Sequence, residues 1–181
     1  MKIINLNDSL TEACFDSFIN FFDKDKVNLV TSSSTLNSLE LVLARGTNIQ
    51  DRIKIARYLI DSGIEVNYID KKNKRNALHY LFSNVLRADV SFYLEATQIL
   101  IENSININQK DKYGAIPLSY AIANVKLDSK TMKPVYMLLL KNGSNYNDAD
   151  NYGNSCLDYA SKFSWRTEFL EFVKEFENEN R

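Results

Sequence analysis

The side chains that could carry out catalysis are few and far apart in this sequence. His79 is the single histidine among 181 residues, and the two cysteines are Cys14 and Cys156. Any pair of nucleophile and base would have to use His79, and one histidine with two distant thiols does not make a tetrahedral zinc site. Asp148 and Asp150 lack the ligand spacing of a calcium loop, and no glycine-rich phosphate-binding motif occurs. We therefore expect no enzyme activity, no cofactor and no bound metal.

Composition and charge narrow the class of protein further. The 22 basic and 23 acidic residues nearly cancel, so the large positive charge typical of nucleic-acid binders is missing. The basic run at 71–75 is expected to be a solvated turn, with protein contact and nucleic-acid contact as alternatives. Five glycines and two prolines are too few for the turns of a β-sandwich. No apolar run could span a membrane or form a secretory signal, and two cysteines suggest no disulfide framework, so we expect a cytoplasmic protein.

The chain repeats one pattern at least three times. An asparagine and an aspartate recur together, three positions apart: Asn67 with Asp70, Asn108 with Asp111, and Asn147 with Asp150. A leucine follows each aspartate, at Leu78, Leu118 and Leu157, and Leu39 continues this series towards the N-terminus. Both landmarks keep a period of about 40 residues, which is typical of stacked repeat architectures.

Each unit is predicted to contain a turn, a helix, a loop and a second helix. The turn sequences 111–114 and 150–153 begin with Asp, which can accept hydrogen bonds from backbone amides, and end with Gly. Pro117 suits the first turn of a helix. In the earlier unit, whose turn has no glycine, Asn73 is expected to take the left-handed position. Second helices are predicted over 53–61, 92–103 and 135–141, ending at Gly63, Ser104 and Gly143.

This unit resembles the ankyrin repeat. The stretch from Asp111 to Ala121 matches the family's turn and first helix, Leu139 to Gly143 matches the end of its second helix, and His79 falls on the family's histidine position. The resemblance implies an all-α, ankyrin-like solenoid of helix–turn–helix repeats, in which His79 bonds to turn backbone. Because the family period is about 33 residues, we expect enlarged loops between the paired helices, at 45–52, 83–91 and 124–133.

We expect a single ankyrin-repeat domain over residues 1–181. Its parts are an N-terminal cap at about 8–34 and repeats at about 35–69, 70–110, 111–149 and 150–178. The N-terminal cap carries an apolar helical stripe between Leu10 and Phe22. At the other end, Phe169 and its apolar neighbours alternate with glutamates, so a capping helix with an acidic outer face is expected to close the stack.

The resemblance also implies a concave protein-binding surface made of turn tips and first helices. By position it selects twelve residues: Lys72, Arg75, Ser83, Asn84, Lys112, Tyr113, Ala115, Asn124, Asn151, Tyr152, Asn154 and Lys162. Tyr113 and Tyr152 share one turn-tip position, where contact with a partner and packing between turns are both open. Replacing these two tyrosines together with Arg75 is expected to weaken partner binding and leave thermal unfolding nearly unchanged.

The resulting expectation is a non-enzymatic protein-binding module. Stand-alone degenerate chains of this kind look like bacterial immunity proteins, which neutralise a cognate toxin, often a nuclease. The expected partner is therefore a toxin domain, and the acidic C-terminal helix would steer a basic toxin towards it. The alternative is an ankyrin-type adaptor or effector that binds a host or regulatory protein. No nucleic acid, membrane or small-molecule substrate is expected as a partner.

Overall fold

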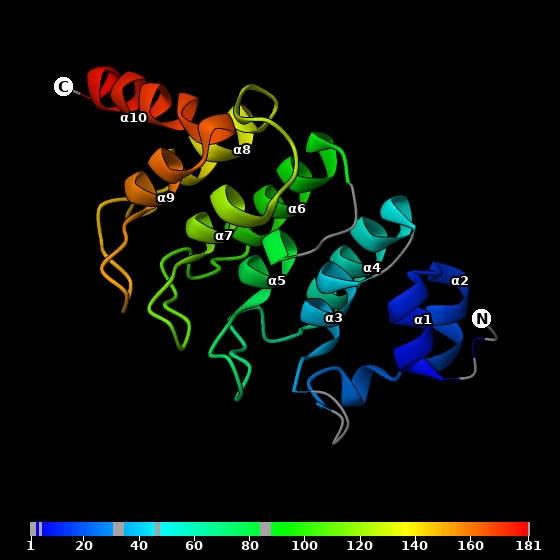
Figure 1. Ribbon diagram of the computed structural model, residues 1–181. Coiled ribbons are helices and arrows are strands. Elements are labelled where there is room, and N and C mark those ends of the chain that lie inside the picture. Colours follow the sequence, from blue (N-terminus) through cyan, green and yellow to red (C-terminus); the bar gives the residue numbers. More distant parts are fainter. Residues whose placement is uncertain (1–2, 4, 31–34, 46–47, 84–87, 181) are drawn as a thin grey trace.

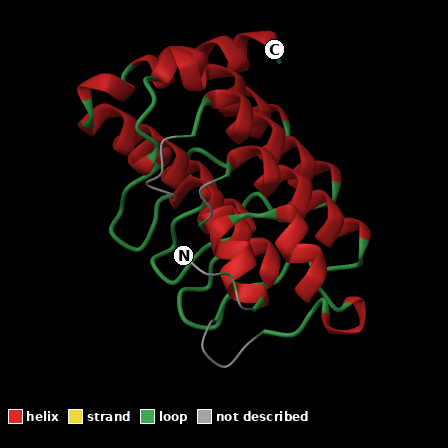
Figure 2. Cartoon of the chain, turned by 90° about the vertical axis from the view of Figure 1, so that its right-hand side faces the viewer, coloured by secondary structure: helices red, strands yellow, loops and turns green. Residues whose placement is uncertain are grey.

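Every regular element that the structure describes is a helix. The computed structural model describes residues 3, 5–30, 35–45, 48–83 and 88–180 (Figure 1). Within these ranges there are ten α-helices and two short 3-10 helices but no strand (Figure 2). The predicted all-α class is confirmed. None of the described helices combines the length and the apolar character that crossing a membrane requires.

The α-helices form five consecutive pairs. These are α1 (Leu6–Glu12) with α2 (Phe15–Phe21), α3 (Ser38–Ala44) with α4 (Ile49–Asp61), α5 (Ala77–Ser83) with α6 (Val90–Glu102), α7 (Pro117–Asn124) with α8 (Ser129–Lys141), and α9 (Cys156–Lys162) with α10 (Glu168–Glu179). The 3-10 helices are η1 (Lys24–Lys26) and η2 (Ser164–Arg166). Successive pairs pack side by side, so the first helices form one row and the second helices form another (Figure 1). The apolar core lies between the two rows.

Three loops that join one pair to the next project from the same edge of the stack (Figure 1). We call them fingers 70–75, 111–115 and 150–154. In finger 111–115, the Asp111 amide donates to the Ala115 carbonyl at 3.0 Å, and the other two fingers close in the same way. Backbone bonds also join the fingers, because the Lys112 amide donates to the Asn73 carbonyl at 2.8 Å and the Asn151 amide to the Tyr113 carbonyl at 2.9 Å.

A row of asparagines in the segments that follow the second helices joins the pairs. The side-chain amide of Asn67 donates to the Ser104 carbonyl at 2.8 Å, and its oxygen accepts from the Asn106 amide at 2.7 Å. Asn108 makes the same two bonds to the next pair, and Asn28, which follows the first pair, makes them to the segment after α4 in the second pair. The repeated asparagine of the sequence is therefore a side chain that links each pair to its neighbour.

Several predicted boundaries are wrong, each for an identifiable reason. The enlarged loops expected at 45–52, 83–91 and 124–133 are shorter than predicted, because Asn48, Asp89 and Asp128 cap α4, α6 and α8 and start these helices early. The stripe between Leu10 and Phe22 is split into α1 and α2, since Ala13 takes the left-handed conformation with φ 50°. In finger 70–75 the positive φ belongs to Lys74, at 61°, rather than to Asn73.

The expected acidic face of the last helix is largely paired within the stack. Lysines of α8 reach glutamates of α10, with Lys133 2.7 Å from Glu175 and Lys141 3.2 Å from Glu179. Lys130 lies 3.1 Å from Glu168 in the same way. Because these charges are neutralised locally, the α10 face provides less negative potential than the sequence suggested, which weakens the expectation that it steers a basic toxin.

Two buried arginines hold the ends of first helices. Arg52 donates from Nε to the Val42 carbonyl at 2.9 Å and from Nη2 to the Leu43 carbonyl, near the end of α3. Arg166 bonds the Val125 and Leu127 carbonyls after α7. Both side chains are fully buried. They satisfy carbonyls that a helix end leaves without an intrahelical donor.

Candidate functional site

His79 links two neighbouring helix pairs. It is fully buried on α5, its Nε2 donates to the Ala115 carbonyl at 3.1 Å, and its Nδ1 accepts from the Asn76 amide at 3.3 Å. Burial lowers the pKa of the imidazole to about 4, so the ring is neutral at pH 7. The prediction that His79 bonds to turn backbone is confirmed. Both ring nitrogens are engaged in holding the stack.

The two cysteines lie towards opposite ends of the stack of helix pairs, and both are free thiols. Cys156 is buried on α9, where burial raises the pKa of its thiol to about 12. Cys14 precedes α2 and is half-buried. Within the described part of the chain, no three histidine, cysteine or carboxylate side chains are placed to hold a metal ion.

Each finger is built around one aspartate that is bonded to a tyrosine of the following helix. In finger 150–154, one carboxylate oxygen of Asp150 accepts from the Tyr152 and Asn154 amides at 2.9 and 3.0 Å. The other oxygen accepts from the Tyr159 hydroxyl at 2.6 Å. Asp111 with Tyr120 and Asp70 with Tyr80 repeat this arrangement. Burial opposes ionisation of Asp150, but these donors outweigh it and lower the pKa of the carboxyl.

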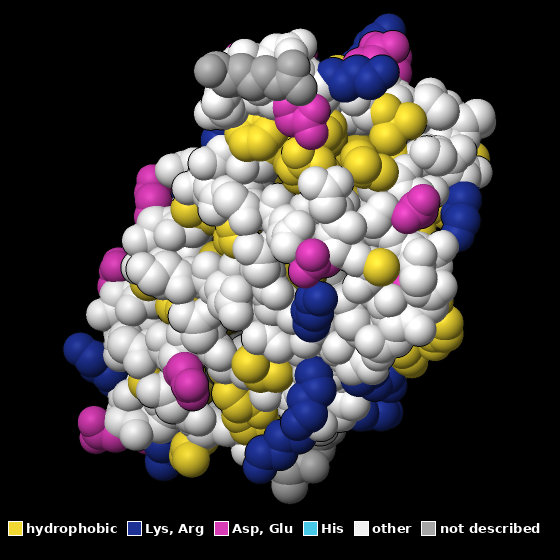
Figure 3. All heavy atoms as spheres, turned by 90° about the vertical axis from the view of Figure 1, so that its left-hand side faces the viewer, with side chains coloured by type: hydrophobic (Ala, Val, Ile, Leu, Met, Phe, Trp, Pro, Cys, Tyr) yellow, Lys and Arg dark blue, Asp and Glu magenta, His cyan; other side chains and the backbone are white. Residues whose placement is uncertain are grey.

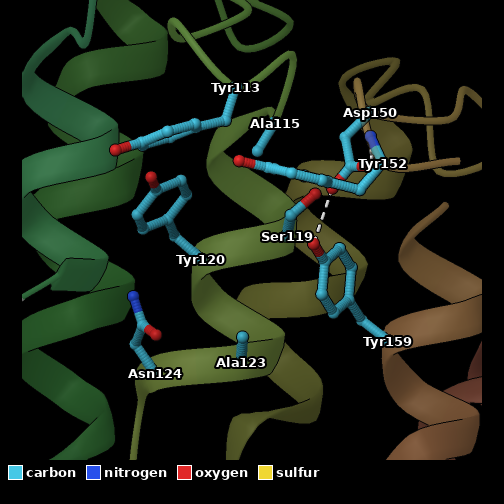
Figure 4. Close-up of a pocket in the computed structure, with 9 residues that line it drawn as sticks. All are labelled: Tyr113, Ala115, Ser119, Tyr120, Ala123, Asn124, Asp150, Tyr152 and Tyr159. Carbon is cyan, nitrogen blue, oxygen red and sulfur yellow. Dashed lines mark hydrogen bonds between the residues drawn. The ribbon is translucent and has the colours of Figure 1, made fainter. Parts of the chain in front are cut away.

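A hollow of about 360 Å³ opens between α7 and α9, below fingers 111–115 and 150–154 (Figure 4). Its lining residues are Tyr113, Ala115, Ser119, Tyr120, Ala123, Asn124, Asp150, Tyr152 and Tyr159. The rings of Tyr113 and Tyr152 extend from the fingers, and those of Tyr120 and Tyr159 come from the two helices (Figure 4). We call this feature the tyrosine hollow. It combines apolar ring surface with hydroxyl groups, a combination that suits recognition of another molecule.

The two finger-tip tyrosines combine both roles that the sequence left open. The Tyr113 and Tyr152 rings contact each other, with centroids 6.3 Å apart and planes inclined by 33°. Both stay accessible, since Tyr113 is 38% and Tyr152 is 69% exposed. Packing between fingers therefore fixes the rings in place and still leaves ring surface for a partner.

Cations of the protein lie against three of the four rings. The Arg75 guanidinium is 4.6 Å from the Tyr120 ring centroid, and the Lys112 ammonium is 4.8 Å from that of Tyr113. The Lys162 ammonium lies 5.7 Å from the Tyr159 centroid. The face that Figure 3 shows carries both basic and acidic side chains, and several basic ones lie in its lower part beside hydrophobic side chains. The surroundings of the hollow are thus basic as well as aromatic.

The structure gathers some of the twelve predicted residues and separates others. Four line the tyrosine hollow, namely Tyr113, Ala115, Asn124 and Tyr152. Outside the hollow, Lys72, Lys112, Asn151 and Lys162 are exposed, and Asn154 is half-buried. Ser83 is also half-buried and donates to the His79 carbonyl at 2.6 Å. Asn84 lies outside the described residues.

Two of the predicted residues have structural duties that the sequence did not reveal. The Arg75 side chain is only 20% exposed. Its Nε donates to Oδ2 of Asp111 at 3.4 Å, and its Nη2 donates to the Tyr120 hydroxyl. Replacing Arg75 would remove contacts at the junction of two pairs, which argues against the expectation that its charge can be reversed without loss of stability. Ala115 is 9% exposed and accepts from His79, so it offers little side-chain surface.

Several residues of the hollow were not predicted as site residues. Asp150 was predicted only as the start of a turn, and Tyr120, Tyr159, Ser119 and Ala123 were not predicted to line a site. A signal was available, because Tyr120 and Tyr159 follow their aspartates by the same nine positions. Ser119 and Ala123 lie four residues apart, so they share a face of α7.

Comparison with known proteins assigns no family to this chain. No protein-family model matches the sequence, and a search of curated proteins finds no similar one. The functional argument therefore depends on the geometry of the fingers and of the tyrosine hollow.

Proposed function

We propose that this chain is an ankyrin-type repeat protein that binds another protein without catalysing a reaction. The observation that carries the proposal is the edge formed by the three fingers. Backbone hydrogen bonds between neighbouring fingers hold the residues of this edge in a defined arrangement. Lys112, Tyr113, Asn151 and Tyr152 stand on this edge and are exposed. A surface whose side chains are already ordered loses little entropy on binding, which favours use as a recognition surface.

The ankyrin assignment is supported by the agreement between sequence landmarks and contacts. Each repeated asparagine before the last links one pair to the next, and each repeated aspartate organises a finger. His79, at the family's histidine position, bonds to the backbone of the neighbouring finger. Sequence positions that share a period thus share a physical role, which is the behaviour of a true structural repeat.

Within this class we propose that the chain is an immunity protein that neutralises a bacterial toxin. The support is the resemblance of stand-alone degenerate ankyrin chains to such proteins, together with a recognition edge that spans several pairs. Four or five pairs can supply a standard interface of roughly 800 Å² per partner. Binding at that scale is sufficient to block the surface of a small toxin domain.

A growth test with the product of the neighbouring gene examines this proposal. The neighbouring product would be expressed in a bacterial host alone, with the intact chain, and with the chain carrying Leu118→Ala as a destabilised control. We expect the neighbouring product to stop growth, and the intact chain to restore growth and to co-purify with it. If the product is harmless, or is harmful with no rescue and no complex, the immunity proposal is wrong.

A further inference from the structure

We propose that the tyrosine hollow receives one large apolar or aromatic side chain from an acidic segment of a partner protein. This inference rests on the proposed protein-binding function and deepens it, since it names the anchoring position and the charge of the partner segment. Three observations carry it: the carboxylates that are already bonded within the protein, the cations beside the rings, and the size of the hollow.

The carboxylates beside the hollow are largely occupied by donors of the protein itself, with four on Asp111 and three on Asp150. Asp150 accepts two backbone amides on one oxygen and the Tyr159 hydroxyl on the other. Asp111 likewise accepts two amides on one oxygen, with Tyr120 and Arg75 on the other. A lysine or arginine entering the hollow would find both acids already engaged in holding the fingers.

Two exposed lysines lie at the rim of the hollow. Lys112 and Lys162 are exposed and lie against rings of the hollow. Among the described residues, neither has a carboxylate within ion-pair distance, whereas Arg75 is paired with Asp111. Because an aromatic ring attracts cations to its face, the three rings already hold cations of this protein. A second cation from a partner would meet like charge, while an acidic group would meet the Lys112 ammonium and that of Lys162, which also donates to the Asn154 side-chain oxygen.

The size of the hollow suits one side chain. Ala115, Ser119 and Ala123 are among its lining residues, and its volume of about 360 Å³ is sufficient for one bulky side chain. Aromatic or large aliphatic anchors that fill such depressions commonly dominate the binding energy of an interface. The complement of this region is therefore an apolar anchor flanked by aspartate or glutamate.

A nucleic acid would also bring negative charge and flat rings, but the geometry favours a protein. The Tyr113 and Tyr152 rings are 6.3 Å apart and already touch, so they leave no slot into which a base could stack between them. The whole chain carries a net charge of -1, without the basic excess that supports phosphate binding.

Peptide selection on the intact chain tests the inference. Random peptides of about 12 residues would be displayed on phage, selected on the immobilised chain and sequenced. We expect enrichment of sequences with Trp, Phe or Leu next to two or more Asp or Glu residues. The affinity of one enriched peptide would then be measured by fluorescence anisotropy on the wild-type chain and on three variants, each checked for folding by circular dichroism.

The variants separate binding at the hollow from general charge attraction. Tyr152→Ala, and the double variant Lys112→Glu with Lys162→Glu, are each expected to weaken the peptide by about tenfold or more. Lys174→Glu makes the same type of replacement at one exposed position of α10 and is expected to leave the affinity unchanged. All of these side chains are exposed in the structure, so their replacement leaves the core intact.

Enrichment of basic peptides, no enrichment, or an affinity that the hollow variants do not alter would each overturn the inference. Tighter binding of a single-stranded DNA of similar length would assign the site to nucleic acid instead. If the Tyr152→Ala chain neutralised a neighbouring toxin as well as the wild type does, this inference would be wrong and the proposed function would remain. Peptide binding at the hollow without any rescue of growth would do the reverse.

Discussion

Glu40 on α3 makes stability depend on pH in a direction that can be calculated. Its side chain is 1% exposed, one oxygen accepts from the Asn37 amide at 3.1 Å, and no described residue bonds to the other. Burial, reinforced by the nearby charge of Asp70, raises the pKa of the carboxyl from 4.5 to about 9. Glu40→Gln keeps the shape of the side chain and removes the titration.

The sign of the effect follows from proton binding. Between pH 4.5 and about 9 the folded chain keeps a proton on Glu40 that the unfolded chain loses, so this contribution to stability falls as pH rises. One pKa unit corresponds to about 1.4 kcal/mol. Over three units, from pH 4.5 to about pH 7.5, the loss reaches about 4 kcal/mol, and residual hydration reduces it to about 2–4 kcal/mol.

Thermal unfolding followed by circular dichroism measures this contribution. For a chain of this size, about 1 kcal/mol corresponds to about 2–4 °C, so the Glu40→Gln variant should melt about 5–15 °C above the wild type near pH 7.5. Near pH 4.5 the two should melt together, because both side chains are then neutral. Exposed Glu171 on α10 provides the control, and Glu171→Gln should show no such change with pH. A melting difference that is the same at both pH values would refute the burial argument.

Further outcomes can be measured by the same unfolding assay. The pKa of His79 is about 4 in the folded chain and 6.5 in the unfolded chain. Its contribution to the free energy of unfolding is therefore complete above pH 6.5, and up to about 3 kcal/mol is lost as pH falls towards 4. The His79→Gln variant should not show this loss of stability at acid pH. Leu118→Ala removes a fully buried side chain and should cost about 2–5 kcal/mol, whereas a cost below about 1 kcal/mol would contradict the packing described. Gly153→Ala, at φ 78° with open space around it, should cost about 1–2 kcal/mol. Gly114→Ala should cost more, since the new Cβ would lie 2.6 Å from the Asn151 side-chain oxygen; equal costs would show that this approach is relaxed in solution.

Much of the helical framework could be predicted because it is encoded in local, repeated signals. Pro117 lies in the first turn of its helix as expected, and positive φ values at Gly63 and Gly143 follow the second helices. Asn48 and Asp89 are of residue types that favour the N-cap of a helix, so the starts of α4 and α6 could have been predicted in the same way. Both residues were instead assigned to loops. Recognising the caps would have shortened the expected insertions.

The tyrosine hollow was less predictable because it depends on contacts between different pairs. Tyr113 and Tyr152 are 39 positions apart in sequence, and their ring contact follows only from the stacking register. Arg75 likewise looked like one member of a basic run, yet it reaches Asp111 and Tyr120 of the next pair. Local sequence patterns carry no information on contacts between different pairs. The burial of Arg75 could therefore not be predicted without the three-dimensional arrangement.

The asparagine links also bear on how such a chain can change its length. Asn28, Asn67 and Asn108 each meet the same two backbone groups, an amide and a carbonyl, in the unit that follows. A gene duplication that inserts one complete unit would recreate these bonds at both new junctions, whereas insertion of a partial unit would leave a junction unmatched. Growth in whole modules is therefore the evolutionary path of least disruption, and each added module would lengthen the edge available to other molecules by one finger.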